Sequence, residues 1–506
     1  MPRSWTRPLL LAVAGIALLQ SSYILALPPF RGADEFDHAF RASGVADGQV
    51  RLDEPAIDGR GEVVYVPAAL VEAAAPQCKA LPYSQPANCR SGAERSDGRV
   101  AVATAAGSYH PAYYWTVGTA GAAFEATTSL YAMRIASGLL CLGLVVIGLL
   151  GLASGRRDAL VWLGALAGLT PTFAYSSIVV APNGIEMAAG FAAWGMVLSL
   201  FAAPSRIPRR LESWFIALAT LACVVLVTVR TLGPVWLLLI VLCVSALVGP
   251  REVLARIRAR PVAFALAIGA TGLAALAGLA WSMSSGLASG SAPASDIVSD
   301  KGPIVAFRWP LWTLQAIASA PLKDDSAPAV VYALVLVVVM GVVGAGIRRG
   351  SRRARFAVLL ACLLALAVPT GLVLATYQSQ GGVWQGRYAL PFLCGLPVLA
   401  AWCAPAGLAS SVGSTARRWW LIGGVVCLAA AHAMTSVSLQ ASELQRAASA
   451  EDDTWLRLPL VVTAGLAVLG VLVAGLAMSR IPRTGPPPAG DTVGQLAGRG
   501  LRDAGA

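Results

Sequence analysis

The sequence predicts an all-α polytopic membrane protein, with about twelve transmembrane helices and a small mixed extracytoplasmic loop domain after the first helix. Composition is the first reason: 57% of the 506 residues are hydrophobic and only 13% are charged. Such a chain has too little polar surface to cover several soluble domains. The second reason is that apolar runs of bilayer-spanning length recur along the chain as far as residue 478.

Twelve apolar segments suit a hydrocarbon core about 30 Å thick. The first segment lacks a convincing small-x-small cleavage site in "SSYILALPPF", and similar segments follow it, so we expect it to remain as a helix. In chain order the segments lie near residues 8–29, 128–154, 159–180, 184–203, 212–230, 233–249, 261–281, 328–347, 357–377, 389–405, 419–439 and 457–478.

Arginine residues gather in alternate loops, and this pattern predicts how the helices are oriented. Cytoplasmic loops carry an excess of Lys and Arg, so the Arg-rich loops and both chain termini are expected in the cytoplasm. The short outer loops then carry only Arg230, Arg387 and Arg446. The inner loops carry Arg3/Arg7, Arg156/Arg157, Arg206/Arg209/Arg210, Arg251/Arg256/Arg258/Arg260, Arg348/Arg349/Arg352/Arg353/Arg355, Arg417/Arg418 and Arg480/Arg483.

The net charge of +12 follows from these topology signals. A nucleic-acid-binding protein would need a contiguous basic face, and here the arginines come in short clusters between apolar runs. We therefore expect the lipid bilayer as a partner and no nucleic acid.

The spans divide the chain into six regions. We expect residues 1–29 to form the cytoplasmic N-terminus and first helix, 30–127 an extracytoplasmic loop domain, 128–281 helices 2–7, 282–327 a second extracytoplasmic loop, 328–478 helices 8–12, and 479–506 a disordered tail. The region 30–127 contains two strand-like runs, "EVVYVP" and "RVAVAT", and the tail is rich in Pro and Gly.

Two of the nine cysteines differ from the rest. Seven lie in apolar runs, where a thiol behaves as a small hydrophobic group. Cys78 and Cys89 instead flank a short polar stretch of the first outer loop, where an oxidising compartment permits a disulfide. We expect that disulfide; the alternative is two free thiols.

The stretch "PPFRGADEFDHAF" places Asp34, Glu35, Asp37 and His38 directly after the first apolar run. Carboxylates beside low-dielectric protein become more basic, which suits a general base or a metal-binding pair. A divalent cation (Mg or Mn) is a candidate ligand of Asp34 and Glu35. The alternative is an ordinary solvated loop.

A second candidate segment, "GSYHPAYYWTVG", precedes the second helix. His110, Tyr113 and Tyr114 could stack against a sugar or line a groove. The alternative is an aromatic belt at the membrane interface, which is the better interpretation for Trp115.

A third segment, "GGVWQGRYALP", contains Gln385, Arg387 and Tyr388 at the outer end of two helices. Arg387 runs against the positive-inside trend, and a phosphate partner would explain it because guanidinium binds phosphate bidentately. An anionic headgroup or a salt bridge to Asp34 or Glu35 is the alternative.

Four further residues are weaker candidates at the outer rim: Arg134, Arg230, Asn183 and Glu186. The chain has no Walker loop, HExxH or GxSxG motif, so soluble nucleotide hydrolysis, zinc proteolysis and serine hydrolase chemistry have no support.

Four stretches together resemble the bacterial multi-pass family known as domain of unknown function 2142. They are "PPFRGADEFDHAFRA", "YVPAALVEAAAPQCKA" with Cys89 following, "YHPAYYWTVG" leading to "YAMRIASGLL", and "VWQGRYALPFL". The resemblance spans roughly residues 20–400. Where the family pattern has Asn-Pro-Asp between helices 3 and 4, this chain has Pro182-Asn183-Gly184.

The layout is also similar to that of the C-type superfamily of membrane glycosyltransferases. This resemblance implies a bacterial plasma-membrane enzyme that moves a sugar from a polyprenyl-phosphate donor to a cell-envelope glycan or lipid acceptor. It further implies Asp34 as the base, Glu35 as a second base or metal ligand, His38 as a neighbour tuning them, and Arg387, with Arg134, on the donor phosphate. The substrate would be lined by Asp37, His110, Tyr113, Tyr114, Asn183, Gln385 and Tyr388. A flippase for a lipid-linked saccharide and a non-catalytic scaffold are the alternatives.

Overall fold

A computed structural model of the chain describes residues 3–81, 84–156, 158–285, 302–322, 325–380, 384–404 and 414–479. The predicted disordered tail beyond residue 479 and the Ser/Gly/Ala-rich part of the predicted second outer loop, residues 286–301, lie outside these residues.

The described part of the chain is a bundle of long apolar helices, as the composition predicts. Ten helical segments are long and apolar enough to cross a membrane, or up to twelve if each of two bent helix pairs is one span. The expectation of about twelve spans is therefore confirmed. The segments are α1 (Arg3–Ala26), α5 (Ala126–Gly155), α8 (Pro182–Ala202), α9 (Glu212–Val229), α12 (Pro261–Ser284), α15 (Ala329–Arg349), α16 (Arg352–Gln380), α20 (Ser414–Leu444), α22 (Leu460–Ser479) and the segment Gly386–Cys403, which contains η4 (Gly386–Ala389), α17 (Leu390–Leu393) and α18 (Leu396–Cys403).

The two bent pairs have local causes. The pair α6 (Ala159–Gly168) and α7 (Pro171–Ile178) bends by 61°, and the pair α10 (Gly233–Val248) and α11 (Pro250–Ala259) bends by 103°. In each pair a proline opens the second helix, because its fixed φ and missing N–H suit the first helical turn. At the first bend, Thr170 caps α7 by accepting a hydrogen bond from the Phe173 N–H at 3.3 Å.

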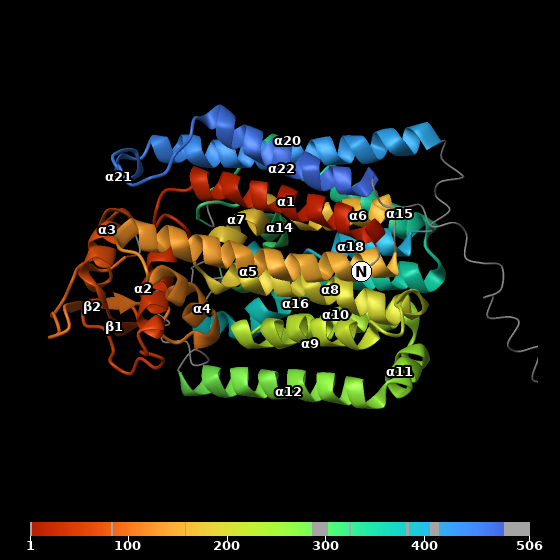
Figure 1. Cartoon of the computed structure of the whole chain (residues 1–506), viewed down its shortest axis with the longest axis horizontal. Helices are drawn as coiled ribbons and strands as arrows, with labels where there is room; N and C mark the ends of the chain where they lie inside the picture. Colours follow the sequence, from red (N-terminus) through yellow and green to blue (C-terminus); the bar gives the residue numbers. More distant parts are fainter. Residues whose placement is uncertain are drawn as a thin grey trace, which may run out of the picture.

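Close helix packing depends on small residues, as is common in membranes. In α5, a Cβ at Gly151 would stand 2.5 Å from the Gly195 carbonyl oxygen of α8, so the two backbones touch there. The first and last helices meet in the same way: a Cβ at Gly15 of α1 would stand 2.4 Å from the Gly470 carbonyl oxygen of α22. Figure 1 shows α1 lying along α22.

One end of the bundle, which we call the loop end, carries the elements between the first two long helices (Figure 1). These are α2 (Glu35–Ala46), β1 (Glu62–Pro67), α3 (Ala68–Lys79), η1 (Pro86–Asn88), β2 (Arg99–Thr104) and α4 (Pro111–Gly121). The two strand-like runs form β1 and β2, an antiparallel pair with Glu62 opposite Thr104 and Pro67 opposite Arg99. A disulfide joins Cys78 of α3 to Cys89 after η1.

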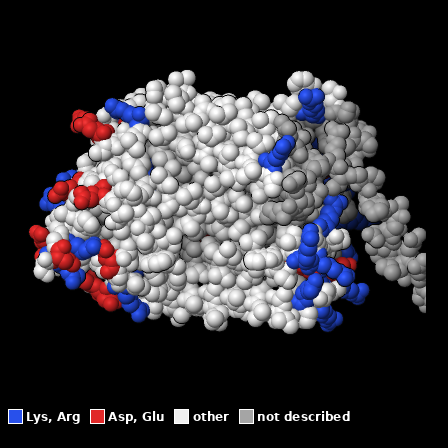
Figure 2. Space-filling view, viewed as in Figure 1, with Lys and Arg blue, Asp and Glu red and all other residues white. Residues whose placement is uncertain are grey.

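Charged side chains gather at the two ends of the molecule. In Figure 2 a broad uncharged band separates a loop end with both signs of charge from an opposite end dominated by Lys and Arg. At that arginine-rich end, Arg353 of α16 pairs with Glu252 of α11 at 3.8 Å, and Glu212 pairs with Arg256 and Arg260. An apolar band between charged ends is what a bilayer requires of the surface it contacts.

Candidate functional site

The candidate site begins in the short loop that leads from α1 to α2. Asp34 occupies the cap position of α2 with φ 57° and ψ 18°, a left-handed conformation that costs free energy in a non-glycine residue. A capping Asp ordinarily accepts hydrogen bonds from the first turn, but this side chain makes no cap hydrogen bond. Its carboxylate is 41% exposed and so is available to groups outside the helix.

The loop end brings Asp34 together with Arg387, which lies 353 residues later in the sequence. Nη2 of Arg387 lies 3.6 Å from Oδ2 of Asp34. The guanidinium is 13% exposed and lies 5.7 Å from the centre of the Tyr388 ring. Its Nε is buried without a hydrogen-bond partner among the described residues. The arrangement therefore places a carboxylate and a guanidinium side by side, with donor capacity left over on the guanidinium.

A second guanidinium lies on the same ring. Arg230, between α9 and α10, has its Cζ 4.8 Å from the centre of the Tyr388 ring. It pairs with Glu186, in the first turns of α8, at 3.3 Å, and Oε1 of Glu186 has no hydrogen-bond partner among the described residues. Asn183 is buried in the first turn of the same helix. Two arginines thus share one tyrosine ring, beside a half-exposed carboxylate.

His38, four residues after Asp34, contacts two tyrosines. Nδ1 of His38 is 2.7 Å from the Tyr114 hydroxyl, and its ring also meets the Tyr109 ring edge-on at 5.4 Å between centroids. Burial lowers the pKa of His38 to about 4, opposed by the charge of Asp34. His38 is therefore neutral at neutral pH and suits a hydrogen-bonding role. Burial also raises the pKa of Tyr109, while the charge of Arg230 lowers it.

Glu35, the residue after Asp34, is buried and fully engaged. Its carboxylate forms a bidentate pair with Arg134 of α5, at 2.8 and 2.6 Å, and both side chains are completely buried. Arg134 also donates to the carbonyl oxygens of Leu27 and Pro28 at 2.8 and 2.7 Å. The Gly32 N–H and the Val180 N–H donate to the same carboxylate. The pair fixes the loop before Asp34. Its hydrogen bonds occupy both side chains, so Glu35 is not available as a base or metal ligand and Arg134 is not available to bind a phosphate.

Asp37 ties α2 to the strand pair. Its carboxylate accepts hydrogen bonds from Arg60 at 2.9 Å, from the Ala105 N–H at 2.9 Å and from Asn88 at 3.4 Å. Burial raises the pKa of Asp37 to about 7, against the lowering effect of the Arg60 charge. Asp37 thus ties α2 to the strand pair, and its hydrogen bonds go to Arg60, Asn88 and the Ala105 N–H.

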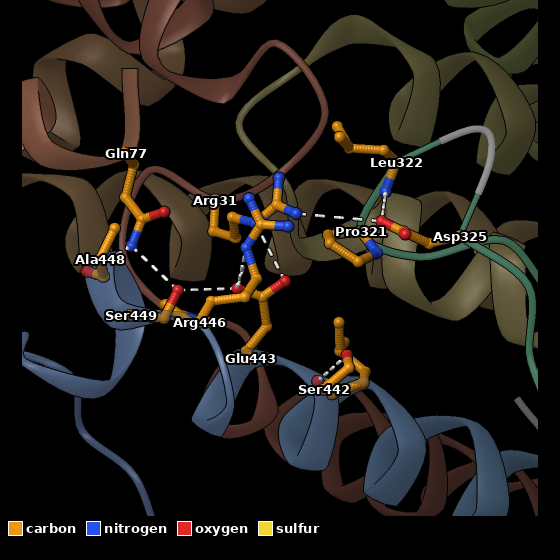
Figure 3. Close-up of polar contacts among 12 residues, drawn as sticks. Arg31, Gln77, Pro321, Leu322, Asp325, Ser442, Glu443, Arg446, Ala448 and Ser449 are labelled. Carbon is orange, nitrogen blue, oxygen red and sulfur yellow. Dashed lines mark hydrogen bonds and ion pairs between the residues drawn. The ribbon is translucent and has the colours of Figure 1, made fainter. Parts of the chain in front are cut away.

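The other side of the loop is anchored by Arg31, which Figure 3 shows between α20 and the segment that follows α14 (Trp309–Ile317). Its Nε donates to both carboxylate oxygens of Glu443, at 2.9 and 3.1 Å, and Ser449 donates to the same carboxylate at 2.7 Å. Nη2 of Arg31 is 3.9 Å from the Asp325 carboxylate. Loop residues on both sides of Asp34 are therefore pinned by buried ion pairs.

A small pocket opens beside Arg387. It is lined by Thr172, Gln315, Ser319, Pro321, Leu322, Gln385 and Arg387. Tyr175 of α7 joins this wall to the Asp34 loop, because its hydroxyl donates to the Pro321 carbonyl at 2.6 Å and accepts from the Ala33 N–H at 3.0 Å. The predicted substrate-lining residue Gln385 thus borders the pocket, and Tyr388 borders the two arginines.

His110 and Tyr113 make their contacts elsewhere. His110 caps α4 by accepting from the Ala112 N–H, and its ring packs edge-on against Trp281 of α12. The Tyr113 hydroxyl lies 3.0 Å from that of Ser137 in α5. Both residues secure α4 in the fold, and neither contact reaches the Asp34–Arg387 pair.

The proposed metal pair of Asp34 and Glu35 does not present two free carboxylates, since Arg134 takes both oxygens of Glu35. Within the described ranges, no group of three or more His, Cys, Asp or Glu side chains is placed to hold a metal ion.

Arg230 is only a weaker candidate from the sequence, and Tyr109 and the pocket walls are not predicted from it. Arg230 carries the same signal as Arg387, an arginine in a loop expected outside, and could have been ranked with it. Thr172 and Gln315 have no such signal, because a hydroxyl or amide near a helix end is common and its neighbours depend on tertiary packing.

One comparison with known proteins identifies the chain. A family model described as "Predicted membrane protein (DUF2142)" matches residues 18–396, which contain Asp34, Arg230 and Arg387. No curated protein and no solved structure matches the chain. Because the matched span covers well over half of the sequence, and because the fold is a bundle of apolar helices with charged ends, the chain belongs to the DUF2142 family of membrane proteins.

Proposed function

We propose that this protein is a membrane glycosyltransferase, which moves a sugar from a polyprenyl-phosphate donor to a hydroxyl group of a cell-envelope glycan or lipid on the outer face of the bacterial plasma membrane. The observation that carries the proposal is the position of the Asp34 carboxylate, half exposed and 3.6 Å from the guanidinium of Arg387. A carboxylate beside an anion-binding group is what transfer from a phosphate leaving group needs.

The carboxylate of Asp34 acts as the general base. It takes the proton of the acceptor hydroxyl as the hydroxyl oxygen bonds to the anomeric carbon of the sugar. Proton removal of this kind contributes about 10²- to 10⁴-fold to a rate. The absence of a cap hydrogen bond supports this role, since it leaves the carboxylate uncommitted to the first turn of α2.

Arg387 and Arg230 hold the leaving phosphate. As the bond from the anomeric carbon to the phosphate oxygen breaks, its electron pair stays on the polyprenyl phosphate, and fixed positive groups stabilise the charge that grows there. Arginine matches phosphate through paired N–H donors. Asp34 lies 3.6 Å from Arg387, so a donor phosphate bound by Arg387 displaces that contact and releases the carboxylate to act as the base.

A lipid-linked donor also fits the location of the site. The three charged groups meet at the loop end, where Asp34 precedes α2. Figure 2 shows an uncharged band between that end and the arginine-rich end. A prenyl chain could remain in the bilayer while its phosphate and sugar reach the loop end. Transfer outside the cytoplasm then needs no nucleotide.

The test is acceptor-dependent consumption of a radiolabelled polyprenyl-phosphate sugar by the purified protein. Asp34→Asn is expected to lower transfer by about 10²- to 10⁴-fold, because the amide cannot take a proton. Asp53→Asn is the matched control, since the Asp53 carboxylate is 83% exposed and has no part in the proposed mechanism. Membrane insertion and thermal stability are measured for both variants. Wild-type transfer by Asp34→Asn would remove the residue from the mechanism, and sugar movement across vesicles without bond cleavage would favour a flippase.

A further inference from the structure

The geometry points to a hydroxyl-reading pocket beside Arg387: one hydroxyl of the donor sugar enters it, accepts a hydrogen bond from Nε of Arg387 and donates one to Oε1 of Gln385. This inference rests on the proposed function, which names a glycosylated donor but leaves its recognition open.

Two residues that line the same pocket carry unpartnered atoms of opposite kind. Oε1 of Gln385 accepts hydrogen bonds and Nε of Arg387 donates them, and both are buried without a partner among the residues that the structure describes. Their side chains both line the pocket. Leaving a buried donor and a buried acceptor unpaired costs free energy, which a ligand that satisfies both would recover.

The pairing of one donor with one acceptor selects the chemistry of that ligand. A hydroxyl both donates and accepts, so it satisfies both atoms at once. A phosphate or carboxylate oxygen suits Arg387 but is repelled by the carbonyl oxygen of Gln385. An ammonium group suits Gln385 but is repelled by the guanidinium. The pocket is also small, so it admits one hydroxyl-sized group and not a whole sugar ring.

The other polar walls of the pocket are already committed to the fold. The Gln315 side chain accepts from the Gly386 N–H at 2.8 Å, and the Thr172 hydroxyl donates to the Gln315 carbonyl at 2.8 Å. Ser319 donates its hydroxyl to the Leu322 carbonyl at 2.9 Å. These bonds hold the shape of the pocket and leave Gln385 and Arg387 as the residues that recognise the hydroxyl group.

One side chain, that of Arg387, connects the pocket to the reacting groups. Nη2 of Arg387 faces Asp34, whereas Nε of the same guanidinium is the unpartnered donor that we assign to the pocket. A hydroxyl bound there would therefore lie within one guanidinium of the donor phosphate, which places it on the transferred sugar itself.

The test measures binding by the full-length protein in nanodiscs. The probes are farnesyl phosphate, a panel of farnesylphosphoryl pentoses and hexoses, and single-deoxy analogues of the tightest of these. We expect that sugar to bind more tightly than farnesyl phosphate, and one deoxy analogue to bind roughly 10- to 100-fold more weakly than its parent. Sites built to hydrogen-bond a hydroxyl reject the analogue that lacks it.

Gln385→Leu is expected to abolish the discrimination between the parent sugar and that analogue, while the affinity for farnesyl phosphate stays unchanged and shows that the variant is folded. Gln445→Leu, at an exposed glutamine, is the matched control and should keep the discrimination. Unchanged discrimination in Gln385→Leu overturns the pocket assignment, and so does a parallel loss of farnesyl phosphate, which would make the pocket a phosphate site. If the wild-type protein binds none of the lipid probes, the proposed function itself is contradicted. If it transfers sugar but Gln385 does not discriminate between hydroxyl and deoxy donors, only the pocket assignment is contradicted.

Discussion

Neighbouring residues of α2 respond to burial in opposite directions. Asp37 and His38 lie in the first turns of this helix and are 1% and 6% exposed. Burial favours the neutral form of each, so it raises the pKa of Asp37 to about 7 and lowers the pKa of His38 to about 4. Both groups therefore link folding to pH, with opposite sign.

The folded pKa of Asp37 lies above its unfolded value of 3.8, so its contribution to stability is present below about pH 4 and is lost as the pH rises through 7. The folded pKa of His38 lies below its unfolded value of 6.5, so its contribution is present above that pH and is lost as the pH falls towards 4. In the wild-type protein the two slopes oppose each other between pH 4 and 6.5.

We expect single variants to separate the two contributions to the pH dependence of stability. Asp37→Asn should make stability rise with pH between 4 and 6.5, and His38→Gln should make it fall between 4 and 7, each by up to about 1.4 kcal/mol per pH unit. The measurement is the thermal unfolding midpoint of the purified protein across this range, with Asp53→Asn as the control. Variants with the same slope as wild type would show that these groups titrate alike in the folded and unfolded states.

At the residue scale the sequence identifies the charged candidates but not the residues with which they pair. Asp34 and Arg387 were found because each is a charged residue in an unusual place, after a membrane run and against the positive-inside trend. Nothing in "ADEFDH" shows that Glu35 pairs with the buried Arg134 and Asp37 with the partly exposed Arg60, while the Asp34 side chain is 41% exposed. That difference arises from the left-handed turn at Asp34 and from Arg134 and Arg60, which come from other elements.

The elements of the bundle depend on glycine contacts that the sequence pattern leaves ambiguous. Gly151 and Gly143 both lie in α5, but only the first meets another backbone: a Cβ at Gly151 would stand 2.5 Å from Gly195, whereas a Cβ at Gly143 meets nothing within 4 Å. Both look identical in an apolar run. Which face of a membrane helix meets its neighbour is set by tertiary packing.

This difference gives a matched pair of variants. Gly151→Ala should destabilise the protein by about 1–3 kcal/mol, because the new methyl group forces α5 and α8 apart. Gly143→Ala should be neutral, or stabilising by up to about 1 kcal/mol, through the better helix propensity of alanine. Thermal unfolding in one detergent checks both. Equal midpoints for the two variants would contradict the close approach of α5 and α8.

Other elements carry a sequence signal of their own. The runs that form β1 and β2 were recognised from their β-branched residues and turns. The helix α2 also had its signal, since Phe36, Ala39 and Phe40 recur at helical spacing and are all buried. The bend between α6 and α7 was harder to see, because Pro171 in a continuous apolar run is compatible with a kinked helix as well as with two helices.

At the scale of the whole molecule, the two charged ends predict which side of the membrane each faces. The arginine-rich end should be cytoplasmic and the loop end extracytoplasmic. Ser91 at the loop end and Ser205 near the arginine-rich end are both exposed, and the described free cysteines are buried or half-buried.

Single cysteine variants test this orientation. In intact cells a membrane-impermeant maleimide should label Ser91→Cys and leave Ser205→Cys unlabelled, with wild type as the baseline; permeabilised cells should label both. The reverse pattern would place Asp34 in the cytosol and remove the basis for transfer from an external lipid carrier.

The contact between α1 and α22 also constrains how the protein is made. A ribosome delivers Gly15 long before Gly470, so the small-residue face of α1 stays against lipid or an insertion factor until α22 arrives. Glu443 of α20, which neutralises Arg31 in the loop before Asp34, is likewise a late product. A nascent chain halted after residue 396 would already contain Asp34, Arg230 and Arg387, yet that loop would still lack its buried counter-ion. Maturation of the site is therefore tied to the synthesis of α20.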